Sequence, residues 1–449
     1  MGTDTVREQA ADEAAERRRE QRGWYVYDWA CSVYSTSVLT VFLGPYLTSV
    51  AKAAADADGF VHPLGIPLRA GSFFAYCVSA SVILSIFVMP LAGAAADRTG
   101  RKKPLLAVAA YLGAAATAGM FFLDGDRYLL GGLLLIVANA SLAVSMVLYN
   151  SYLPQIAPPE ERDAVSSRGW AFGYAAGSLV LVANLILYTA HDTFGVSETT
   201  AVRICLASAG IWWGAFTLVP LKRLRDRRTT SSSGTSTHGW RQLAATVRDL
   251  RRQPLTLAFL LAYLVYNDGI QTVISQASVY GSEELGLDQS TLIVAVLLVQ
   301  LLAVAGALGM GRLARTYGAK RTILGSLVAW TVTLGAGYFL PAGAPVWFFV
   351  LAAGIGLVLG GSQALSRSLF SHLVPPGKEA EYFSAYEMSD RGMSWLGPLL
   401  FGLTYQLTGS YRDAIISLVA FFVVGFLLLA RVPVAQAVRD AGNPVPDRI

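Results

Sequence analysis

Long apolar runs alternate along the chain with short polar or charged segments. A helix of about 20 mostly apolar residues is long enough to cross the hydrocarbon core of a bilayer. The pattern therefore predicts an all-α polytopic membrane protein, and an even number of spans places both termini on one side. Twelve spans are predicted, at roughly residues 24–50, 70–96, 104–123, 128–151, 169–190, 201–220, 255–280, 291–311, 322–342, 345–372, 382–407 and 413–432.

The composition agrees with a chain dissolved in lipid. Of its 449 residues, 54% are hydrophobic and only 14% are charged, whereas soluble domains carry about 25% charged residues. The net charge of +5 does not indicate nucleic acid, because the basic residues separate apolar segments. Each of the three cysteines lies inside an apolar segment and the four histidines are scattered, so we expect no disulfide framework, metal site or cofactor.

The distribution of lysine and arginine predicts the orientation. Two arginines, Arg367 and Arg391, lie within predicted spans, and nearly all the others lie on the side that carries the termini. The positive-inside rule makes that side cytoplasmic, in the inner (plasma) membrane of the cell. Residues 1–22 lack the apolar core of a signal peptide, so they and residues 433–449 are predicted cytoplasmic tails. The predicted outer loops contain five basic residues: Lys52, Arg69, Arg127, Arg203 and Arg412.

A polar segment at 222–254 divides the spans into two groups of six, in predicted bundles at 23–221 and 255–432. The centre of this segment is rich in Ser, Thr and Gly, which is typical of a flexible linker. Its end, "GWRQLAATVRDLRR", predicts either a helix on the membrane surface or a solvated linker helix. One face of that helix would carry Trp240, Leu243, Val247 and Leu250.

Three pairs of segments indicate an internal repeat. "GAAADRTGRKK" (93–103) resembles "GRLARTYGAKR" (311–321), and "IAPPEERDA" (156–164) resembles "LVPPGKEAE" (373–381). "YDWACSVYS" and "YNDGIQTVIS" each place polar residues at i, i+3, i+4 and i+7, which is one helix face. The common order predicts two related six-helix bundles, the parallel repeat of major-facilitator transporters. The two polar stripes are Asp28, Cys31, Ser32 and Ser35, and Asp268, Gln271, Thr272 and Ser275.

Segment 93–103 resembles the loop signature of the major facilitator superfamily, a Gly followed by Asp-Arg-x-Gly-Arg-Lys. Gly93 would allow close helix approach, Gly100 would make the tight turn, and Asp97 would meet a positive helix N-terminus. The basic residues would hold the loop inside: Arg98, Arg101, Lys102 and Lys103.

Further segments narrow the resemblance. "YDWACSVYST", "SSRGWAFGYAAG", "YNDGIQTVI", "ASVYGSEELGL" and "GGSQALSRSLFSHLVPPGKEAEYFSAYEMSDRG" are similar to bacterial members of the autophagy-related vacuolar amino-acid effluxer family. The resemblance covers about residues 23–430 and implies a major-facilitator fold and the movement of a small solute, with amino acids as candidates. The family usually has Asn after "YDWA", where this chain has Cys31, so the first stripe lacks a strong hydrogen-bonding side chain.

Ionisable residues inside predicted spans are the main candidates for a transport site, because such residues usually face the bundle interior. Asp268 lies about 14 residues, roughly 21 Å, into its span, next to Asn267 and the second polar stripe. Gln363 and Arg367 share a helix face at i, i+4. The six ionisable residues are Asp28, Asp268, Arg367, Glu387, Asp390 and Arg391.

Structural explanations stay open for several of these residues. Asp268 would pair with Arg367 or Arg391, Asp28 would hold an inward gate, and Glu387 would neutralise Arg391 at i, i+4.

Three functions are compatible with these observations. In a proton-coupled transporter, Asp268 would receive a proton or an amino group, and Arg367 or Arg391 would receive a carboxylate. In an efflux pump for organic cations the acids would act alone, and a sensor or scaffold would transport nothing. The chain has no nucleotide-binding motif and is not expected to be an enzyme. The expected partners are the bilayer, a small solute and protons but no nucleic acid, and the chain is expected to be a monomer.

The superfamily resemblance also predicts gate contacts. Asp97 should lie near residues 379–383, where Lys378 would suit it, and Arg315 should face the start of span five. We expect Arg315 to pair there with an acid when the inner side is closed; the alternative is a positive-inside anchor. The candidate acids are Glu160, Glu161 and Asp163, and the rest of the second loop comprises Gly311, Gly318, Lys320 and Arg321.

Overall fold

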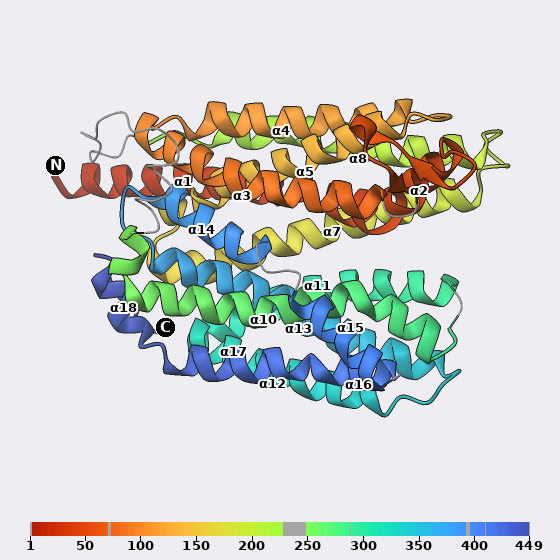
Figure 1. Ribbon diagram of the computed structural model, residues 1–449. Helices are drawn as coiled ribbons and strands as arrows, with labels where there is room; N and C mark the ends of the chain where they lie inside the picture. Colours follow the sequence, from red (N-terminus) through yellow and green to blue (C-terminus); the bar gives the residue numbers. More distant parts are fainter. Residues whose placement is uncertain are drawn as a thin grey trace. The chain divides into compact units, whose positions relative to one another are not determined.

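The computed structural model describes residues 2–70, 73–227, 248–287, 289–391, 396–408 and 410–448. Figure 1 shows that this part of the chain is almost entirely helical. The strands described there are β1 (Phe60–Val61) and β2 (Leu68–Arg69), an antiparallel pair that pairs Phe60 with Arg69. The predicted all-α fold class is therefore confirmed.

The helices form two compact units. Unit 1 comprises Met1–Asn150 and Ala175–Arg228, and unit 2 comprises Ser151–Tyr174 and Thr229–Ile449. Residues 151–174, which the sequence assigned to the first bundle, group with unit 2, and the tails and the linker are divided between the units. One helix, α7, is therefore shared between the two units.

Unit 1 begins with a long helix, because α1 starts at Gly2 and continues through the predicted tail into the first span. The acid at Glu20 forms an ion pair with Arg227, at 2.6 Å, and so ties this helix to the segment after α8. The elements of this unit are α1 (Gly2–Val33), the π-helix η1 (Tyr34–Phe42), α2 (Leu43–Ala53), η2 (Pro63–Gly65), α3 (Phe73–Thr99), α4 (Lys102–Gly119), η4 (Met120–Phe122), α5 (Tyr128–Asn150), the second part of α7 (Arg162–Thr189) and α8 (Glu198–Arg223).

Unit 2 surrounds a core of aromatic and aliphatic side chains, in which Trp330 stacks on Phe422 with ring centroids 5.3 Å apart. Residues 248–252 are helical, and Leu250 packs against this core, while Trp240, Leu243 and Val247 lie outside the described residues. The elements are α6 (Leu153–Ile156), η5 (Pro159–Glu161), the first part of α7, α10 (Pro254–Val279), η6 (Tyr280–Glu284), α11 (Gln289–Tyr317), α12 (Ala319–Tyr338), α13 (Pro345–His372), α14 (Glu379–Arg391), α15 (Leu396–Thr408), α16 (Tyr411–Ser417), α17 (Val419–Arg431) and α18 (Val434–Asp440).

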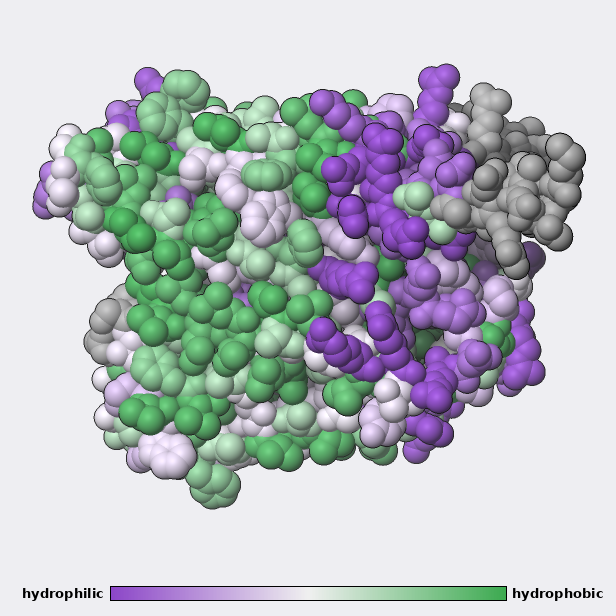
Figure 2. All heavy atoms as spheres, turned by 180° about the vertical axis from the view of Figure 1, so that it is seen from behind, coloured by the Kyte–Doolittle hydropathy of each residue, from purple (hydrophilic) through white to green (hydrophobic). Residues whose placement is uncertain are grey.

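Ten helices in the described part of the chain are long and apolar enough to cross a membrane. The two remaining predicted spans overlap α12, which is helical but less apolar, and the pair α14 and α15, which are separated by residues outside the description. Figure 2 shows that, within each unit, hydrophobic residues cover most of the drawn face and hydrophilic residues gather at one end. The chain is therefore a polytopic membrane protein.

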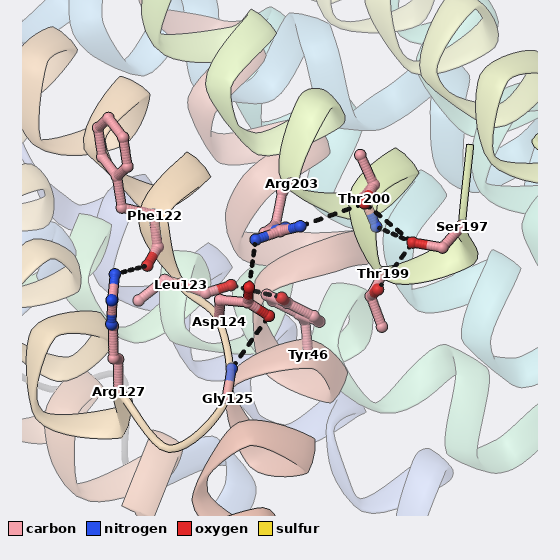
Figure 3. Close-up of polar contacts among 10 residues, drawn as sticks. All are labelled: Tyr46, Phe122, Leu123, Asp124, Gly125, Arg127, Ser197, Thr199, Thr200 and Arg203. Carbon is pink, nitrogen blue, oxygen red and sulfur yellow. Dashed lines mark hydrogen bonds and ion pairs between the residues drawn. The ribbon is translucent and has the colours of Figure 1, made fainter. Parts of the chain in front are cut away.

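A polar clasp joins three helix ends in unit 1 (Figure 3). The hydroxyl of Tyr46 on α2 donates to the carbonyl oxygen of Leu123, just after η4, at 2.6 Å. Arg203 of α8 forms an ion pair with Asp124 at 3.1 Å and also donates to Thr200. These contacts fix the ends of the first, third and sixth predicted spans to one another.

Unit 2 contains a matching clasp. The hydroxyl of Tyr280, after α10, donates to the carbonyl oxygen of Gly337 on α12 at 2.7 Å. Arg412 of α16 pairs with Glu284 at 2.8 Å. A tyrosine and an arginine thus join the same three spans in both halves, but the acid that pairs with the arginine follows α10 here and η4 in unit 1.

Candidate functional site

The carboxylate of Asp268 lies in the interior of unit 2, where its side chain is only 3% exposed. Its Oδ2 accepts a hydrogen bond from the backbone N–H of Gly397 at 2.8 Å. Gly397 is the second described residue of α15. Asp268 therefore links α10 to the backbone of α15. Its Oδ1 is buried and has no hydrogen-bond partner among the described residues.

The contact between α10 and α15 requires glycine at position 397. A Cβ atom there would lie 1.8 Å from Thr272 Oγ1, whereas atoms in contact are normally more than 3 Å apart. The Thr272 hydroxyl itself donates to the Asp268 carbonyl oxygen at 2.7 Å. The predicted stripe varies in burial, because Gln271 is half-buried and Ser275 is exposed. The close contact of α10 with α15 is therefore centred on Asp268 and Thr272.

A second acidic group lies between α10 and α14. Asp390 Oδ1 accepts hydrogen bonds from the Asn267 amide at 2.6 Å and from the Tyr263 hydroxyl at 2.9 Å. Glu387, one turn earlier, is also buried. The side chain of Arg391 lies outside the described residues, so its pairing with Glu387 or Asp268 stays a prediction.

Asp28 has a different environment in unit 1. Its Oδ2 accepts a hydrogen bond from the Tyr149 hydroxyl at 2.7 Å. Trp24 stacks on Tyr149 with ring centroids 4.4 Å apart and donates to its carbonyl oxygen at 2.9 Å. Cys31, the next residue of the first stripe, is buried with its Sγ 3.8 Å from Met146 Sδ. This acid is thus anchored to α5 by an aromatic pair.

Arg367 of α13 is almost completely buried, with 2% exposure, and contacts the first part of α7. Its Nε donates to Ser166 Oγ and its Nη2 donates to the Ser166 carbonyl oxygen, both at 2.9 Å. The guanidinium carbon lies 5.4 Å from the ring centroid of Trp170, a cation–π distance. Arg367 is therefore engaged by two residues of one helix.

Further polar contacts continue along the same two helices within unit 2. The Tyr174 hydroxyl donates to Gln363 Oε1 at 2.8 Å, and Arg162 donates to the Ser371 carbonyl oxygen at 2.9 Å. The Ser166 hydroxyl donates to the Ala364 carbonyl oxygen at 2.7 Å. We call this contact the α7–α13 seam, formed by Arg162, Ser166, Trp170 and Tyr174 on α7 and Gln363, Arg367 and Ser371 on α13.

The α7 side of the seam was not among the predicted site residues. Its members follow one another every four residues, as do those of α13, so each set lies on one helix face. This four-residue spacing of polar and aromatic residues in two segments could have indicated a contact between the two helices. The serine and the aromatic residues fall in the segment "SSRGWAFGYAAG".

The two gating loops have the predicted tight turns. Gly100, between α3 and α4, has φ of +61°, and Gly318, between α11 and α12, has φ of +88°, a conformation that favours glycine. Asp97 pairs with Lys102 at 3.4 Å within the first loop. Its predicted approach to residues 379–383 would join the two units and stays a prediction. Other loop residues are placed as follows: Gly93, Gly311 and Gly318 are buried, and Arg98, Arg101 and Arg321 are exposed.

The second loop approaches the start of α7 within unit 2. The charge of Arg315 acts on Asp163, whereas Glu160 and Glu161 are exposed. A Cβ atom added at Gly311 would lie 2.5 Å from Ser167 Oγ, so α11 and α7 are in close contact. The pairing of Arg315 with one of these acids and its role as a latch both stay predictions.

Two lysines have partners that the sequence did not indicate. Lys378, which was expected to suit Asp97, pairs with Asp249 at the end of the linker, and Tyr382 donates to the same carboxylate at 3.1 Å. Lys320 donates to the carbonyl oxygens of Ala430 at 2.9 Å and Val432 at 2.7 Å, at the end of α17. Both lysines therefore bind helix ends or loops of unit 2.

The helical repeat and the loop turns define a class of membrane protein whose fold solved structures share. The proton:xylose symporter XylE, bound to 6-bromo-6-deoxy-D-glucose, matches with a TM-score of 0.68 and 15% identity over 93% of this chain and 95% of that one. A bacterial homologue of the iron transporter ferroportin, in an outward-facing state, matches with a TM-score of 0.65 and 16% identity over 93% and 98%. The fold is that of the major facilitator superfamily.

Sequence relatives give the family. An uncharacterized MFS-type transporter of Bacillus subtilis (strain 168), YxiO, is 29% identical over 92% of this chain and 95% of the relative. Autophagy-related protein 22-1 of Aspergillus niger is 25% identical over 94% and 90%. The family described as "Vacuole effluxer Atg22 like" matches residues 16–442, and the chain belongs to it. The resemblance predicted from the motifs is thereby confirmed.

Proposed function

We propose that this membrane transporter moves a small solute by alternating access and couples that movement to protons through Asp268. The observation that carries the proposal is the buried carboxylate with one oxygen on Gly397 N–H and the other without a partner among the described residues. An ionised carboxylate inside a membrane span is costly, and protonation removes that cost. Oδ1 is the free position that a proton would occupy.

The coupling also has a structural route. The ionised form of Asp268 accepts the Gly397 N–H of α15 in a charge-assisted hydrogen bond. Protonation removes the charge and weakens this hydrogen bond. A proton on Asp268 would therefore loosen the contact of α10 with α15, which is one way to link a proton to a movement of helices.

The proposed substrate class is the amino acids. The family description as an effluxer supports a transported solute, and a zwitterion would suit an acid and an arginine that both lie inside unit 2. An efflux pump for organic cations would use the acids alone and would have no role for Arg367. We further propose a monomer in the plasma membrane with both termini in the cytoplasm, since most lysines and arginines lie on that side.

A thermal-shift screen of the purified full-length chain tests the substrate class, because a ligand that binds only the folded state raises its stability. The screen compares amino acids, dipeptides and organic amines. A rise in melting temperature with amino acids supports the proposal. A rise with amines alone would favour the organic-cation pump. Proteoliposomes with an imposed pH gradient then test coupling, since flux of the ligand that ignores the gradient contradicts a role for protons.

A further inference from the structure

Helix α7 is continuous from Arg162 to Thr189, yet its residues divide between the units. Residues up to Tyr174 pack with unit 2, and those from Ala175 onward pack with unit 1. Any movement of one unit relative to the other therefore bends α7 or separates its first part from α13. The α7–α13 seam is the contact that such a separation breaks.

The geometry at Arg367 resembles the binding of a carboxylate. Nε and Nη2 are the two donors on one edge of the guanidinium group, and this edge binds both oxygens of a carboxylate side by side. Ser166 presents two oxygens to the same two donors, its Oγ and its carbonyl oxygen, both at 2.9 Å. Ser166 thus fills the position that a carboxylate would take.

The amide of Gln363 on α13 is likewise bound by a residue of α7. Gln363 lies one turn before Arg367 on the same face, and its Oε1 accepts the Tyr174 hydroxyl at 2.8 Å. Both partners, Ser166 and Tyr174, belong to the part of α7 that packs with unit 2. Departure of that part would release the Arg367 edge and the Gln363 side chain together.

We propose that Arg367 is a carboxylate-binding residue whose site is filled by Ser166 in this structure. A solute carboxylate replaces Ser166 when the first part of α7 separates from α13, and Gln363 assists with its amide. The inference rests on the proposed transport function and deepens it, because it assigns the ligand class to solutes that bear a carboxylate. At Arg367 the exchange replaces two N–H···O hydrogen bonds with two charge-assisted ones, which offset part of the seam contacts that the separation breaks, so a solute can shift the balance.

The first experiment measures how Ser166 controls access to the seam. In the full-length chain, Cys31, Cys77 and Cys205 are replaced by alanine, and Ser368→Cys, beside Arg367 and fully buried, is the reporter. The rate of reaction with N-ethylmaleimide is measured in nanodiscs. Ser166→Ala should speed labelling about tenfold, since it removes a hydrogen bond to a charged group. Ser166→Asp, which attaches a carboxylate, should slow labelling about tenfold.

The matched control is Ser326→Ala. Ser326 is also a buried membrane serine, but its hydroxyl donates at 2.7 Å to Ile323 of its own helix. This variant should label at the unmodified rate. Equal rates for the serine, alanine and aspartate forms at position 166 would overturn the proposal.

The second experiment tests the ligand class with acetate, glycine and ethylammonium at equal concentration, with chloride at matched ionic strength. Acetate and glycine should speed labelling several-fold, whereas ethylammonium should not. Arg367→Lys keeps the charge but loses the two-donor edge, so it should abolish the response. A response to ethylammonium equal to that to acetate, no response to either carboxylate, or a full response in Arg367→Lys would each overturn the proposal. Labelling needs no transport, so a chain without flux would contradict the transport function separately.

Discussion

Asp28 and Asp268 each begin the polar stripe of their half of the chain, yet they are held in different ways. Asp28 accepts a hydrogen bond from the side chain of Tyr149, which is itself stacked on Trp24. Asp268 accepts one from the backbone N–H of Gly397, and its second oxygen is buried without a partner among the described residues. A side-chain donor within a rigid aromatic pair favours a fixed acid, whereas a carboxylate with one unoccupied oxygen can bind and release a proton.

We infer from this difference in contacts that the two acids have different tasks. We expect Asp28 to stabilise unit 1 and Asp268 to take part in transport. The predictions below test this division, from the largest expected effect to the smallest.

The largest contrast should come from removing each charge in turn. Asp268→Asn should abolish proton-dependent flux while the protein still inserts, because the amide cannot bind and release a proton. Asp28→Asn should keep flux within about a factor of three, since an amide oxygen can still accept the Tyr149 hydroxyl. The measurement is uptake into proteoliposomes at matched protein levels. Normal pH-dependent flux in Asp268→Asn, or complete loss in Asp28→Asn, would reverse the assignment.

A second test addresses the close contact that holds Asp268 against α15. Gly397→Ala places a Cβ atom 1.8 Å from Thr272 Oγ1, so the helices must move apart. Overpacking of this kind costs about 1–3 kcal/mol, and we expect flux to fall at least about tenfold. Thermal unfolding in detergent and flux are measured together.

The control for that variant is the double substitution Gly397→Ala with Thr272→Ala, which removes the colliding hydroxyl. It should recover part of both stability and flux. No recovery would mean that the close approach is not what supports Asp268.

Removing the donor to Asp28 should affect stability more than transport. Tyr149→Phe takes away the hydroxyl that contacts Asp28 and should destabilise the protein by about 1–3 kcal/mol, because a buried acceptor loses a partner. The melting temperature should fall while flux stays within about a factor of two. A selective loss of flux at unchanged stability would argue that Asp28 also serves transport.

The smallest effect is expected at the water edge of the second gating loop. Arg315→Glu places a second negative charge near Asp163 and should lower flux. Adding Asp163→Arg should restore part of the lost flux, since the exchanged charges attract again. Such pairs are worth about 1 kcal/mol or less. If Arg315→Glu transports normally, Arg315 is a topology anchor and not a latch.

The sequence was sufficient to predict the fold because the signals of a membrane bundle are local. Apolar length, the positions of lysine and arginine, and the repeated loop at 93–103 and 311–321 each depend on a short segment. The depth of Asp268 in its span was equally readable by counting residues.

Partners were harder to predict because they come from distant segments. Arg367 and Ser166 are 201 residues apart. From the sequence we expected only acidic side chains or a solute carboxylate as partners for this arginine. The structure gives it a serine hydroxyl, a backbone carbonyl and an aromatic face. A backbone carbonyl has no signature in a sequence. Gly397 was missed for a related reason, since its importance lies in a contact that only the packed helices reveal.

The shared helix α7 also has a consequence for how the protein is made. Tyr174 and Arg162 meet their partners on α13 only after a further 189 and 209 residues have been synthesised. At about 5–20 residues per second, that interval is roughly 10–40 s. During this time the polar face of α7 has no α13 to bind, and exposed polar groups are costly in hydrocarbon. The ribosome-bound chain must therefore keep this helix near water, the translocation channel or a membrane chaperone until the second half arrives.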